Sequence, residues 1–434
     1  MKNRRVVIVD GVRTPYIKAW TQFNDLSASE LGRIVVRELM ERLDLDPSRV
    51  EEVIIGNVGQ PADTANISRV IALKAGIPNG TPAYTVHRNC ASGMQAVVNA
   101  YRQIMLGEAD MVIAGGVESM SNIPLFFSKS FQEIIQAFQR AKSLPEKLKV
   151  LSTIRPAHLQ PVVGLMLGLT DPVCGLNMGQ TAEVLAREFD ITRQEQDEFA
   201  LMSHQRAEKA AADGLLAEEI VPAYVPPGFK DSVTEDNGIR KGQTMEALAK
   251  LRPVFDKRYG TVTAGNSSQI TDGAAAVLVM SDQKAEELGF EPLGTIRSYA
   301  FAGLDPSRMG LGPVYASHLA LKRAKLKLSA MELIEINEAF AAQVIACEKA
   351  MASPAFAKEH LGSRTSVGKI DREILNVNGG AVALGHPVGS TGTRLILTLL
   401  KEMKRRNLSL GLASLCIGGG QGGAVIVERK QAVE

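Results

Sequence analysis

Two thiols and an imidazole stand in the segments of this sequence best suited to covalent chemistry. Cys90 follows an apolar run and precedes a helical apolar pattern that starts at Met94. We therefore expect this thiol near a helix N-terminus, with Asn89 as the N-cap, where free backbone N–H groups and the helix dipole stabilise a thiolate. A buried structural cysteine is the alternative, and for a single cysteine it is the more frequent case.

His386 lies in a glycine-rich segment, residues 379–392, and Pro387 follows it directly. Proline restricts φ, and the glycines admit backbone geometries and close approaches that other residues do not allow. An ordinary loop histidine is the alternative. Glycines lose more conformational entropy on folding than other residues, so this many would destabilise a purely structural connection. The segment therefore indicates a loop of special shape before a helix.

Cys416 precedes a second glycine-rich run, residues 418–423, which formally satisfies the GxGxxG pattern. A dinucleotide fingerprint opens a helix, whereas this run is followed by the strand-like residues 424–427, so we reject it. The glycines instead expose backbone N–H groups beside the thiol, with Gly418 first among them, and such groups can form an oxyanion hole. A buried structural cysteine is again the alternative.

Asn337 follows an apolar run at residues 333–336. At the end of a strand, its amide can orient a water molecule or donate to a developing oxyanion. The alternative is a helix N-cap with Glu338 in the first turn, and the sequence alone favours that cap.

The elements that position these residues alternate between short buried strands and longer helices, which predicts an α/β fold. Strand, helix and strand recur in one order around Cys90 and again around His386. This repeat predicts two duplicated α/β halves whose equivalent loops meet at one interface. Strands are expected at residues 6–9, 53–55, 111–114, 333–336 and 424–427, and helices at residues 31–43, 90–106 and 391–403.

Residues 122–251 interrupt this pattern. Residues 126–154 are expected to be largely helical, with a break at Pro145, and they are rich in lysine and arginine. A solvated helix with a packed loop is the simpler interpretation. The sharper one is an amphipathic surface, within residues 126–170, that meets lipid or a partner subunit. Residues 221–231 and 234–242 are expected to be loops.

Composition excludes several classes of protein. The 49 basic and 47 acidic side chains leave a formal charge of +2, which does not indicate a nucleic-acid-binding protein. Four cysteines without a CxxC pair argue against a disulfide scaffold or a zinc cluster and favour a reducing compartment, so we expect a cytoplasmic protein. Residues 1–5 are basic, but the apolar run after them is too short for a secretory signal, and no segment predicts a membrane span.

Segments across nearly the whole chain resemble the thiolase family and occur in the family's order. They include the segments around Cys90, Asn337, His386 and Cys416. The resemblance implies a layered α-β-α-β-α core with an inserted loop domain. It divides the chain into residues 1–121 and 252–292 for the N-terminal half, 122–251 for the insertion and 293–434 for the C-terminal half. The matching segments are residues 11–15, 89–93, 115–120, 177–179, 251–253, 260–266, 337–340, 385–387 and 416–422.

The resemblance also implies roles for residues. Cys90 would attack the 3-oxo carbon of a 3-oxoacyl-CoA, and His386 would take the thiol proton. Asn337 would act through an ordered water, Cys416 would serve as acid and base for the α-carbon of acetyl-CoA, and the N–H groups of Cys90 and Gly418 would form a second oxyanion hole. Coenzyme A and acyl-CoA are then substrates, and no metal or redox cofactor is implied.

For CoA, the matching positions are Arg240 near the nucleotide end, Ser268 toward the pantetheine, and Met178 and Phe340 as apolar walls. A guanidinium in a polar loop can grip a phosphate, and surface charge is the alternative for a single arginine.

The basic insertion resembles that of thiolase subunits in fatty-acid oxidation complexes, which implies thiolytic cleavage in β-oxidation and a hydratase/dehydrogenase partner subunit. Those members usually carry His at the position of Asn337, so condensation of two acetyl-CoA into acetoacetyl-CoA stays open. A ketoacyl synthase would need a second histidine where Cys416 stands. A non-catalytic acyl-CoA or lipid-binding relative would have lost Cys90, His386 or Cys416. A homodimer or homotetramer is expected.

Overall fold

The computed structural model describes residues 4–430, so residues 1–3 of the basic N-terminal stretch, where no signal segment is expected, lie outside it. Each expected strand and helix forms within these residues. The first helix, α1 (Ala28–Arg42), illustrates why the predicted elements form. Ser27 caps it by accepting from the Glu30 N–H, and apolar side chains at helical spacing form one buried face. The α/β fold class predicted from the alternation is confirmed.

The N-terminal half contributes mostly buried strands and helices that cover them. Its elements are β1 (Val6–Arg13), β2 (Ile17–Lys18), α1, β3 (Glu52–Gly56), α2 (Ile67–Lys74), β4 (Ala83–Val86), α3 (Ser92–Leu106), β5 (Met111–Ser119), β10 (Thr271–Ser281) and α10 (Asp282–Glu287).

The C-terminal half repeats the arrangement. Its elements are β11 (Gly294–Gly303), α11 (Gly312–Ala324), β12 (Leu333–Ile336), α12 (Ala341–Ala352), α13 (Pro354–His360), α14 (Ala381–Leu384), α15 (Val388–Arg405), β13 (Leu410–Ile417) and β14 (Gln421–Glu428).

One ten-stranded sheet runs through both halves in the order β12-β13-β14-β11-β1-β10-β5-β3-β4, with β2 paired to β10. The halves join where Val7 and Ile8 of β1 face Thr295 and Gly294 of β11. The strand order on one side of this joint is the mirror image of the order on the other side. β3 runs parallel to β5 across α3, and β12 runs parallel to β13 across α15. The predicted duplication is therefore confirmed as two equivalent β-α-β units.

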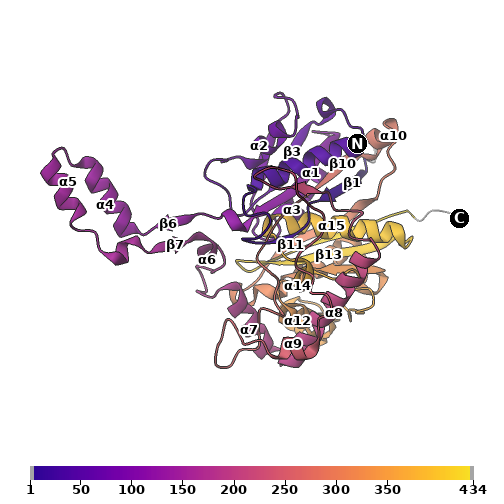
Figure 1. The fold of residues 1–434 in the computed structure, drawn as a ribbon. Helices are drawn as coiled ribbons and strands as arrows, with labels where there is room; N and C mark the ends of the chain where they lie inside the picture. The colour runs from indigo at the N-terminus through magenta and orange to yellow at the C-terminus, as the bar shows by residue number, and fades with distance from the viewer. Residues whose placement is uncertain (1–3, 431–434) are drawn as a thin grey trace.

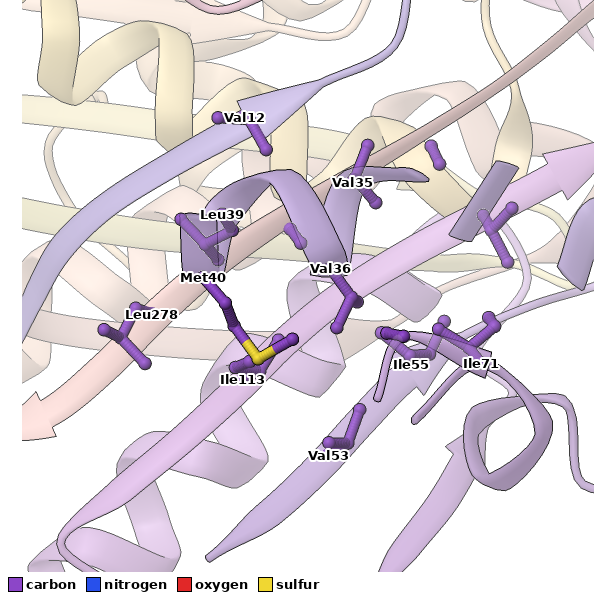
Figure 2. Packing of buried hydrophobic residues seen from close by; sticks show 14 of the residues in the cluster. Val12, Val35, Val36, Leu39, Met40, Val53, Ile55, Ile71, Ile113 and Leu278 are labelled. Carbon is purple, nitrogen blue, oxygen red and sulfur yellow. The ribbon is translucent and has the colours of Figure 1, made fainter. Parts of the chain in front are cut away.

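The helices form three layers around the two half-sheets (Figure 1). α1 and α2 pack on the outer face of the N-terminal strands, as Figure 2 shows for Val35, Leu39 and Met40 of α1 against Ile113 and Leu278. α3 and α15 lie together in the middle layer, and one apolar cluster joins them to strands of both halves. α11 and α12 cover the outer face of the C-terminal strands. The middle layer thus brings the two predicted catalytic helices into contact.

The insertion has two parts. One part projects from the body as an arm, which we define as residues 125–163 (Figure 1). The other part packs against the body and returns to β10. The arm holds β6 (Leu125–Phe127), α4 (Lys129–Arg140), α5 (Leu144–Leu151) and β7 (Pro161–Val163), and the remainder holds α6 (Gly164–Gly168), α7 (Met178–Glu188), α8 (Arg193–Ala212), β8 (Ala223–Tyr224), β9 (Ser232–Val233) and α9 (Met245–Ala249).

Two local expectations for the insertion need correction. Pro145 does not break a helix; it lies in the first turn of α5, where its missing N–H is harmless, and the chain breaks instead between α4 and α5. The segment 221–231 is not entirely loop, because its residues Ala223 and Tyr224 form β8, which pairs with β9. The segment 234–242 contains no helix or strand, as expected.

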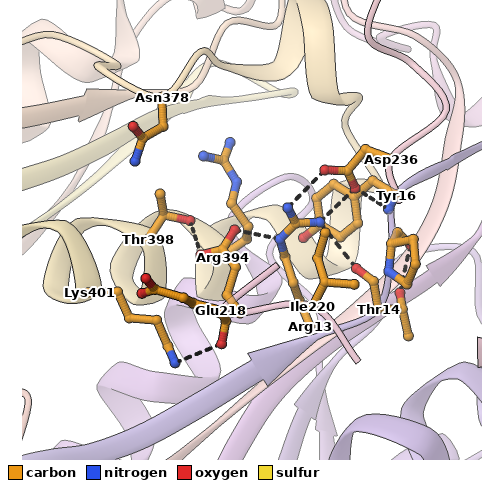
Figure 3. A network of polar contacts seen from close by, with 12 residues as sticks. Arg13, Thr14, Tyr16, Glu218, Ile220, Asp236, Asn378, Arg394, Thr398 and Lys401 are labelled. Atoms are coloured by element: carbon orange, nitrogen blue, oxygen red, sulfur yellow. Dashed lines mark hydrogen bonds and ion pairs between the residues drawn. The ribbon is translucent and has the colours of Figure 1, made fainter. Parts of the chain in front are cut away.

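Buried ion pairs fasten the packed part of the insertion to β1 (Figure 3). Arg13 of β1 is fully buried, and its Nε lies 2.6 Å from Glu219 and its Nη1 2.7 Å from Asp236. Asp236 also accepts from the backbone N–H of Tyr16 at 2.6 Å. Since Glu219 and Asp236 flank the β8–β9 hairpin, this network holds the start of the segment that leads to Arg240.

Within residues 4–430, no helix is long and apolar enough to cross a membrane. In the same part of the chain, no group of three or more His, Cys, Asp or Glu side chains is arranged to hold a metal ion.

Candidate active site

The N-termini of α3 and α15 meet almost backbone to backbone, and glycines make this approach geometrically feasible. A Cβ on Gly93 would lie 2.5 Å from Thr393 Oγ1 and 2.8 Å from the Gly389 carbonyl oxygen. A Cβ on Gly392 would collide with the backbone N–H of Met94. Gly93, next to Cys90, and the glycines that follow His386 therefore serve one junction, which fixes the two segments relative to each other.

Cys90 lies in the turn that leads into α3. Asn89 adopts a left-handed conformation with φ of 43°, and the N-cap of α3 is Ala91, without a side-chain cap. The prediction of Asn89 as the N-cap is therefore wrong. Its side chain serves another purpose, because Asn89 Nδ2 donates to the carbonyl oxygen of Gly418 at 2.7 Å. This bond ties the Cys90 turn to the glycine-rich turn of the C-terminal half.

The glycine-rich turn joins β13 to β14 and faces Cys90. Gly419 and Gly420 have φ of 87° and 74°, a region that other residues rarely adopt, so the turn depends on glycine there. The backbone N–H groups of Gly418 and of Cys90 itself point at the Cys90 thiol and lower its pKa. Two backbone donors therefore converge on one sulfur, as an oxyanion hole or a thiolate site requires.

Burial nevertheless outweighs these donors at both thiols. Desolvation raises the pKa of Cys90 above its ordinary value, against the opposing effect of the two N–H groups. Backbone N–H groups therefore do stabilise the thiolate, as expected, but burial outweighs them, so the resting thiol is protonated and needs a proton acceptor. Burial also raises the pKa of Cys416 well above its ordinary value, and the nearby charge of a Cys90 thiolate raises it further.

His386 is buried and is held in one orientation. Its Nδ1 lies 2.7 Å from Thr391 Oγ1, and that hydroxyl donates to the carbonyl oxygen of Pro387 at 3.1 Å. The hydroxyl oxygen therefore accepts from Nδ1–H, which leaves Nε2 unprotonated. Burial, aided by the charge of Arg394, lowers the pKa of His386 to about 3. The imidazole is consequently neutral, and its Nε2 carries the lone pair that can accept a proton.

Asn337 is the neighbour of that nitrogen. Its Nδ2 lies 3.4 Å from His386 Nε2, and its backbone N–H donates to the Ser414 carbonyl oxygen at 2.9 Å. The alternative of a helix cap is excluded, because α12 begins at Ala341 with Phe340 as its N-cap. The side chain is fully buried, and its Oδ1 has no partner among the described residues. A buried amide oxygen without a partner is a place for a water molecule or a substrate group.

Met178 and Phe340 line the same place from the apolar side. Both pack in a cluster that contains Cys416, and Met178 Sδ lies 3.2 Å from the position a Cβ on Gly418 would take. Phe340 stacks edge-on with Phe255 at 5.9 Å between ring centroids. The two predicted walls thus lie beside the second thiol and the glycine-rich turn.

Ser268 and Arg240 lie further out. The N–H of Ser268 donates to the Ala339 carbonyl oxygen at 2.9 Å, next to Phe340. Arg240 lies over α8, where its backbone N–H donates to His204 Nδ1 at 3.2 Å. The structure therefore gathers Cys90, Gly418, Cys416, Met178 and Phe340 with one another and His386 with Asn337, while Arg240 lies outside this group.

Glu118 was not predicted as a site residue, although it lies in residues 115–120, one of the segments that match the family. In the structure its carboxylate joins the loops of the site. Its carboxylate accepts from the side chain of Asn57 at 3.1 Å and from the backbone N–H groups of Val58 at 3.1 Å, Gly59 at 2.8 Å and Gly389 at 3.0 Å. Burial raises its pKa to about 7. An acid inside an otherwise apolar strand was the signal available in the sequence, because buried carboxylates need such partners.

Both halves of the chain match known families. Residues 6–283 match the family described as "Thiolase, N-terminal domain", and residues 290–429 match "Thiolase, C-terminal domain". This chain belongs to the thiolase family. The candidate site of this thiolase lies where the two matched domains meet, at the contact between α3 and α15.

Similar proteins extend over the full length of this thiolase. It is 45% identical over 425 residues to a 3-ketoacyl-CoA thiolase of Yersinia enterocolitica, covering 98% of this chain and 97% of the relative. It is 44% identical over 428 residues to a 3-ketoacyl-CoA thiolase of Pectobacterium carotovorum, with coverage of 98% and 97%.

Solved structures agree with this thiolase's fold. The Bacillus anthracis acetyl-CoA acetyltransferase superposes with a TM-score of 0.86 at 39% identity and covers 98% of both chains. Human mitochondrial 3-ketoacyl-CoA thiolase in complex with CoA superposes with a TM-score of 0.85 at 36% identity, covering 99% of this chain and 98% of that one.

Proposed function

We propose that this thiolase is a 3-ketoacyl-CoA thiolase, which cleaves a 3-oxoacyl-CoA with CoA into acetyl-CoA and a shortened acyl-CoA. The observation that carries this proposal is the approach of two thiols, the half-buried Cys90 and the buried Cys416, at a turn where two backbone N–H groups face the first. The relatives named above support the substrate class. The two-thiol arrangement suits an acyl transfer that also moves a carbon-bound proton.

The first half-reaction makes the acyl-enzyme. His386 Nε2 takes the Cys90 proton, and the sulfur attacks the 3-oxo carbon of the substrate. The bond between C2 and C3 then breaks, and its electrons pass to the leaving acetyl-CoA, whose α-carbon takes a proton from Cys416. Asn337 helps to hold the oxygen that develops charge in this step, through its amide and a water molecule.

The second half-reaction returns the enzyme. The thiol of CoA gives its proton to the Cys416 thiolate and attacks the thioester carbon on Cys90. The N–H groups of Cys90 and Gly418 stabilise the oxyanion, and the Cys90 sulfur leaves and takes back its proton from His386. Met178 and Phe340 form the apolar wall beside the pantetheine, Ser268 lies further along it, and Arg240 receives a phosphate.

A Cys90→Ala variant tests the assignment. We expect loss of thiolysis and of the acyl adduct that intact-protein mass spectrometry detects after incubation with acyl-CoA. Cys174→Ala, which changes a half-buried cysteine outside the site, is the matched control and should keep both. An adduct that survives in Cys90→Ala would contradict the proposal.

Acetoacetyl-CoA synthesis from two acetyl-CoA is the second candidate. Asn337, at a position where thiolases of oxidation complexes usually carry His, favours it, and a relative by structure is named an acetyl-CoA acetyltransferase. Thiolysis rates across 3-oxoacyl-CoA substrates of increasing chain length separate the two. Activity restricted to the shortest substrate would refute the role in fatty-acid β-oxidation.

The arm supports a proposal about partners. Its side chains are at most half-buried, its apolar ones include Leu125, Phe126, Phe127, Leu144 and Leu148 at 49–70% exposure, and the surface is rich in lysine and arginine. Exposed apolar groups gathered on one projection indicate an interaction surface. We infer that the arm binds a hydratase/dehydrogenase subunit of a fatty-acid oxidation complex.

Size-exclusion chromatography of this chain, alone and with such a subunit, tests the arm. We expect a homodimer or homotetramer alone and a larger complex together, and a stable oligomer that ignores the subunit would refute the inference. Co-sedimentation with anionic vesicles tests the alternative of peripheral membrane contact by the same surface.

We also propose a cytoplasmic location, and the four free cysteines support a reducing environment.

A further inference from the structure

Lys18 and Arg240 are two half-buried cations without a counter-charge. Within residues 4–430, neither Lys18 Nζ nor the Arg240 guanidinium makes a hydrogen bond, an ion pair or a contact with an aromatic ring. Every other half-buried lysine or arginine in that range has an acid, an amide or carbonyl oxygen, or a ring as its partner. A charge taken partly out of water and left unpaired calls for a ligand.

The backbone brings these two residues together. Asn237, three residues before Arg240, accepts from the backbone N–H of Lys18 at 2.7 Å, and its own N–H donates to the Tyr16 carbonyl oxygen at 3.3 Å. The Arg240 backbone is held in turn by His204 of α8. Lys18 in β2 and the loop of the insertion that carries Arg240 are thereby fixed side by side.

The electrostatics at this place agree with the geometry. The charge of Arg240 adds to burial in lowering the pKa of Lys18, and burial with both cations lowers the pKa of His204 to about 4. His204 is therefore neutral and serves as an acceptor for the Arg240 backbone, not as a third cation. Two like charges held close together are stabilised by an anion between them.

This pair is linked to the catalytic loop by a single side chain. Gln269 Nε2 donates to the carbonyl oxygen of Gly238 at 3.0 Å and to that of Val382 in α14 at 3.3 Å. Gly238 lies two residues before Arg240, and α14 ends just before His386. Ser268, the residue proposed along the pantetheine, directly precedes Gln269. A ligand that lies along Ser268 can therefore reach both the thiol site and the cation pair.

We propose that Lys18 and Arg240 together bind a phosphate group of CoA, which makes Lys18 a further substrate-binding residue. The inference rests on the proposed function, because that function supplies CoA as the ligand. A guanidinium binds a phosphate through two parallel hydrogen bonds, and a lysine adds a compact charge. CoA carries phosphate chemistry in two places, the 3′-phosphate and the diphosphate, and the test separates them.

Calorimetric titration with CoA and with 3′-dephospho-CoA tests the pair in wild type, Lys18→Gln and Lys18→Arg. Loss of one charge-assisted contact is expected to weaken CoA binding by about tenfold in Lys18→Gln, with most affinity restored in Lys18→Arg. Lys241→Gln, which changes an exposed lysine next to Arg240, is the matched control and should bind CoA as wild type does.

Each outcome is informative. Weakening for CoA alone assigns the pair to the 3′-phosphate, and equal weakening for 3′-dephospho-CoA assigns it to the diphosphate. A dissociation constant for both ligands within twofold of wild type in Lys18→Gln overturns the inference, as does equal weakening in Lys241→Gln.

Thiolysis kinetics of the same variants separate this inference from the proposed function. A rise in KM for CoA in Lys18→Gln, with a much smaller change in kcat, is expected. A wild type that binds CoA through Lys18 but cleaves no 3-oxoacyl-CoA contradicts the proposed thiolysis and leaves the phosphate contact standing. Normal thiolysis with an unchanged KM in Lys18→Gln overturns the contact alone.

Discussion

Gly93→Ala should separate the two catalytic helices while leaving every proposed catalytic side chain chemically unchanged. The added methyl would lie 2.5 Å from Thr393 Oγ1, 2.8 Å from the Gly389 carbonyl oxygen and 3.0 Å from the Thr393 backbone nitrogen. The Thr393 side chain can rotate, but the two backbone atoms belong to α15 and cannot. The clash is therefore relieved only if α15 moves away from α3 by several tenths of an ångström.

The magnitude follows from two opposing terms. Overpacking of this kind costs about 1–3 kcal/mol, and replacing glycine by alanine within a helix returns about 1 kcal/mol. The net loss in the free energy of unfolding should thus be small, about 0–2 kcal/mol. Activity is more sensitive, since a 1 Å misplacement of reacting groups costs about a hundredfold, and the smaller shift here should cost about tenfold in kcat.

Denaturant unfolding and steady-state thiolysis measure the two effects. Gly80→Ala is the control, because a Cβ at Gly80 meets no atom within 4 Å, and this variant should match wild type in both assays. A Gly93→Ala enzyme with wild-type kcat would refute the argument that this junction sets the active-site geometry. Loss of kcat with stability close to wild type would separate a positional effect from unfolding.

Three further substitutions test the surrounding network. Arg13→Met should lower the free energy of unfolding by about 3–5 kcal/mol, because it leaves Glu219 and Asp236 buried without their cation, and denaturant unfolding would show it. Asn337→Ala should reduce kcat about a hundredfold with little change in unfolding, and a wild-type kcat would exclude its role at the oxyanion. Glu118 has a pKa raised from 4.5 to about 7, so it favours the folded state at low pH and loses this contribution as the pH rises through that window. Glu118→Gln should therefore flatten the dependence of unfolding free energy on pH between about 4.5 and 7, by up to about 3 kcal/mol, and an unchanged slope would contradict the raised pKa.

Periodicity predicted the repeated elements because a helix or strand in the core shows its buried face in the sequence. Leu31, Val35 and Leu39 recur at helical spacing and are buried on α1. The equivalence of the segments around Cys90 and His386 predicted that they would meet, but not that glycines would let α3 and α15 touch. That contact depends on two segments almost three hundred residues apart, and no local pattern records it.

The predictions that the structure corrected also depend on contacts between distant parts of the chain. Asn89 has the residue type of an N-cap, yet its partner is the Gly418 carbonyl oxygen in the other half of the chain. The net pKa of Cys90 depends on how deeply the thiol is buried, which the first turn of a helix does not reveal. Lys18 carried no motif, and only the fold places it beside Arg240.

The arm begins and ends at one place. Leu125 of β6 pairs with Val163 of β7, so the chain enters and leaves the projection side by side. An ancestral gene could therefore gain or lose the whole segment by closing a short surface loop, an exchange that costs little conformational entropy and leaves the core untouched. The means of joining a larger assembly can in this way be acquired or discarded as a module, independently of the chemistry that the two halves carry out.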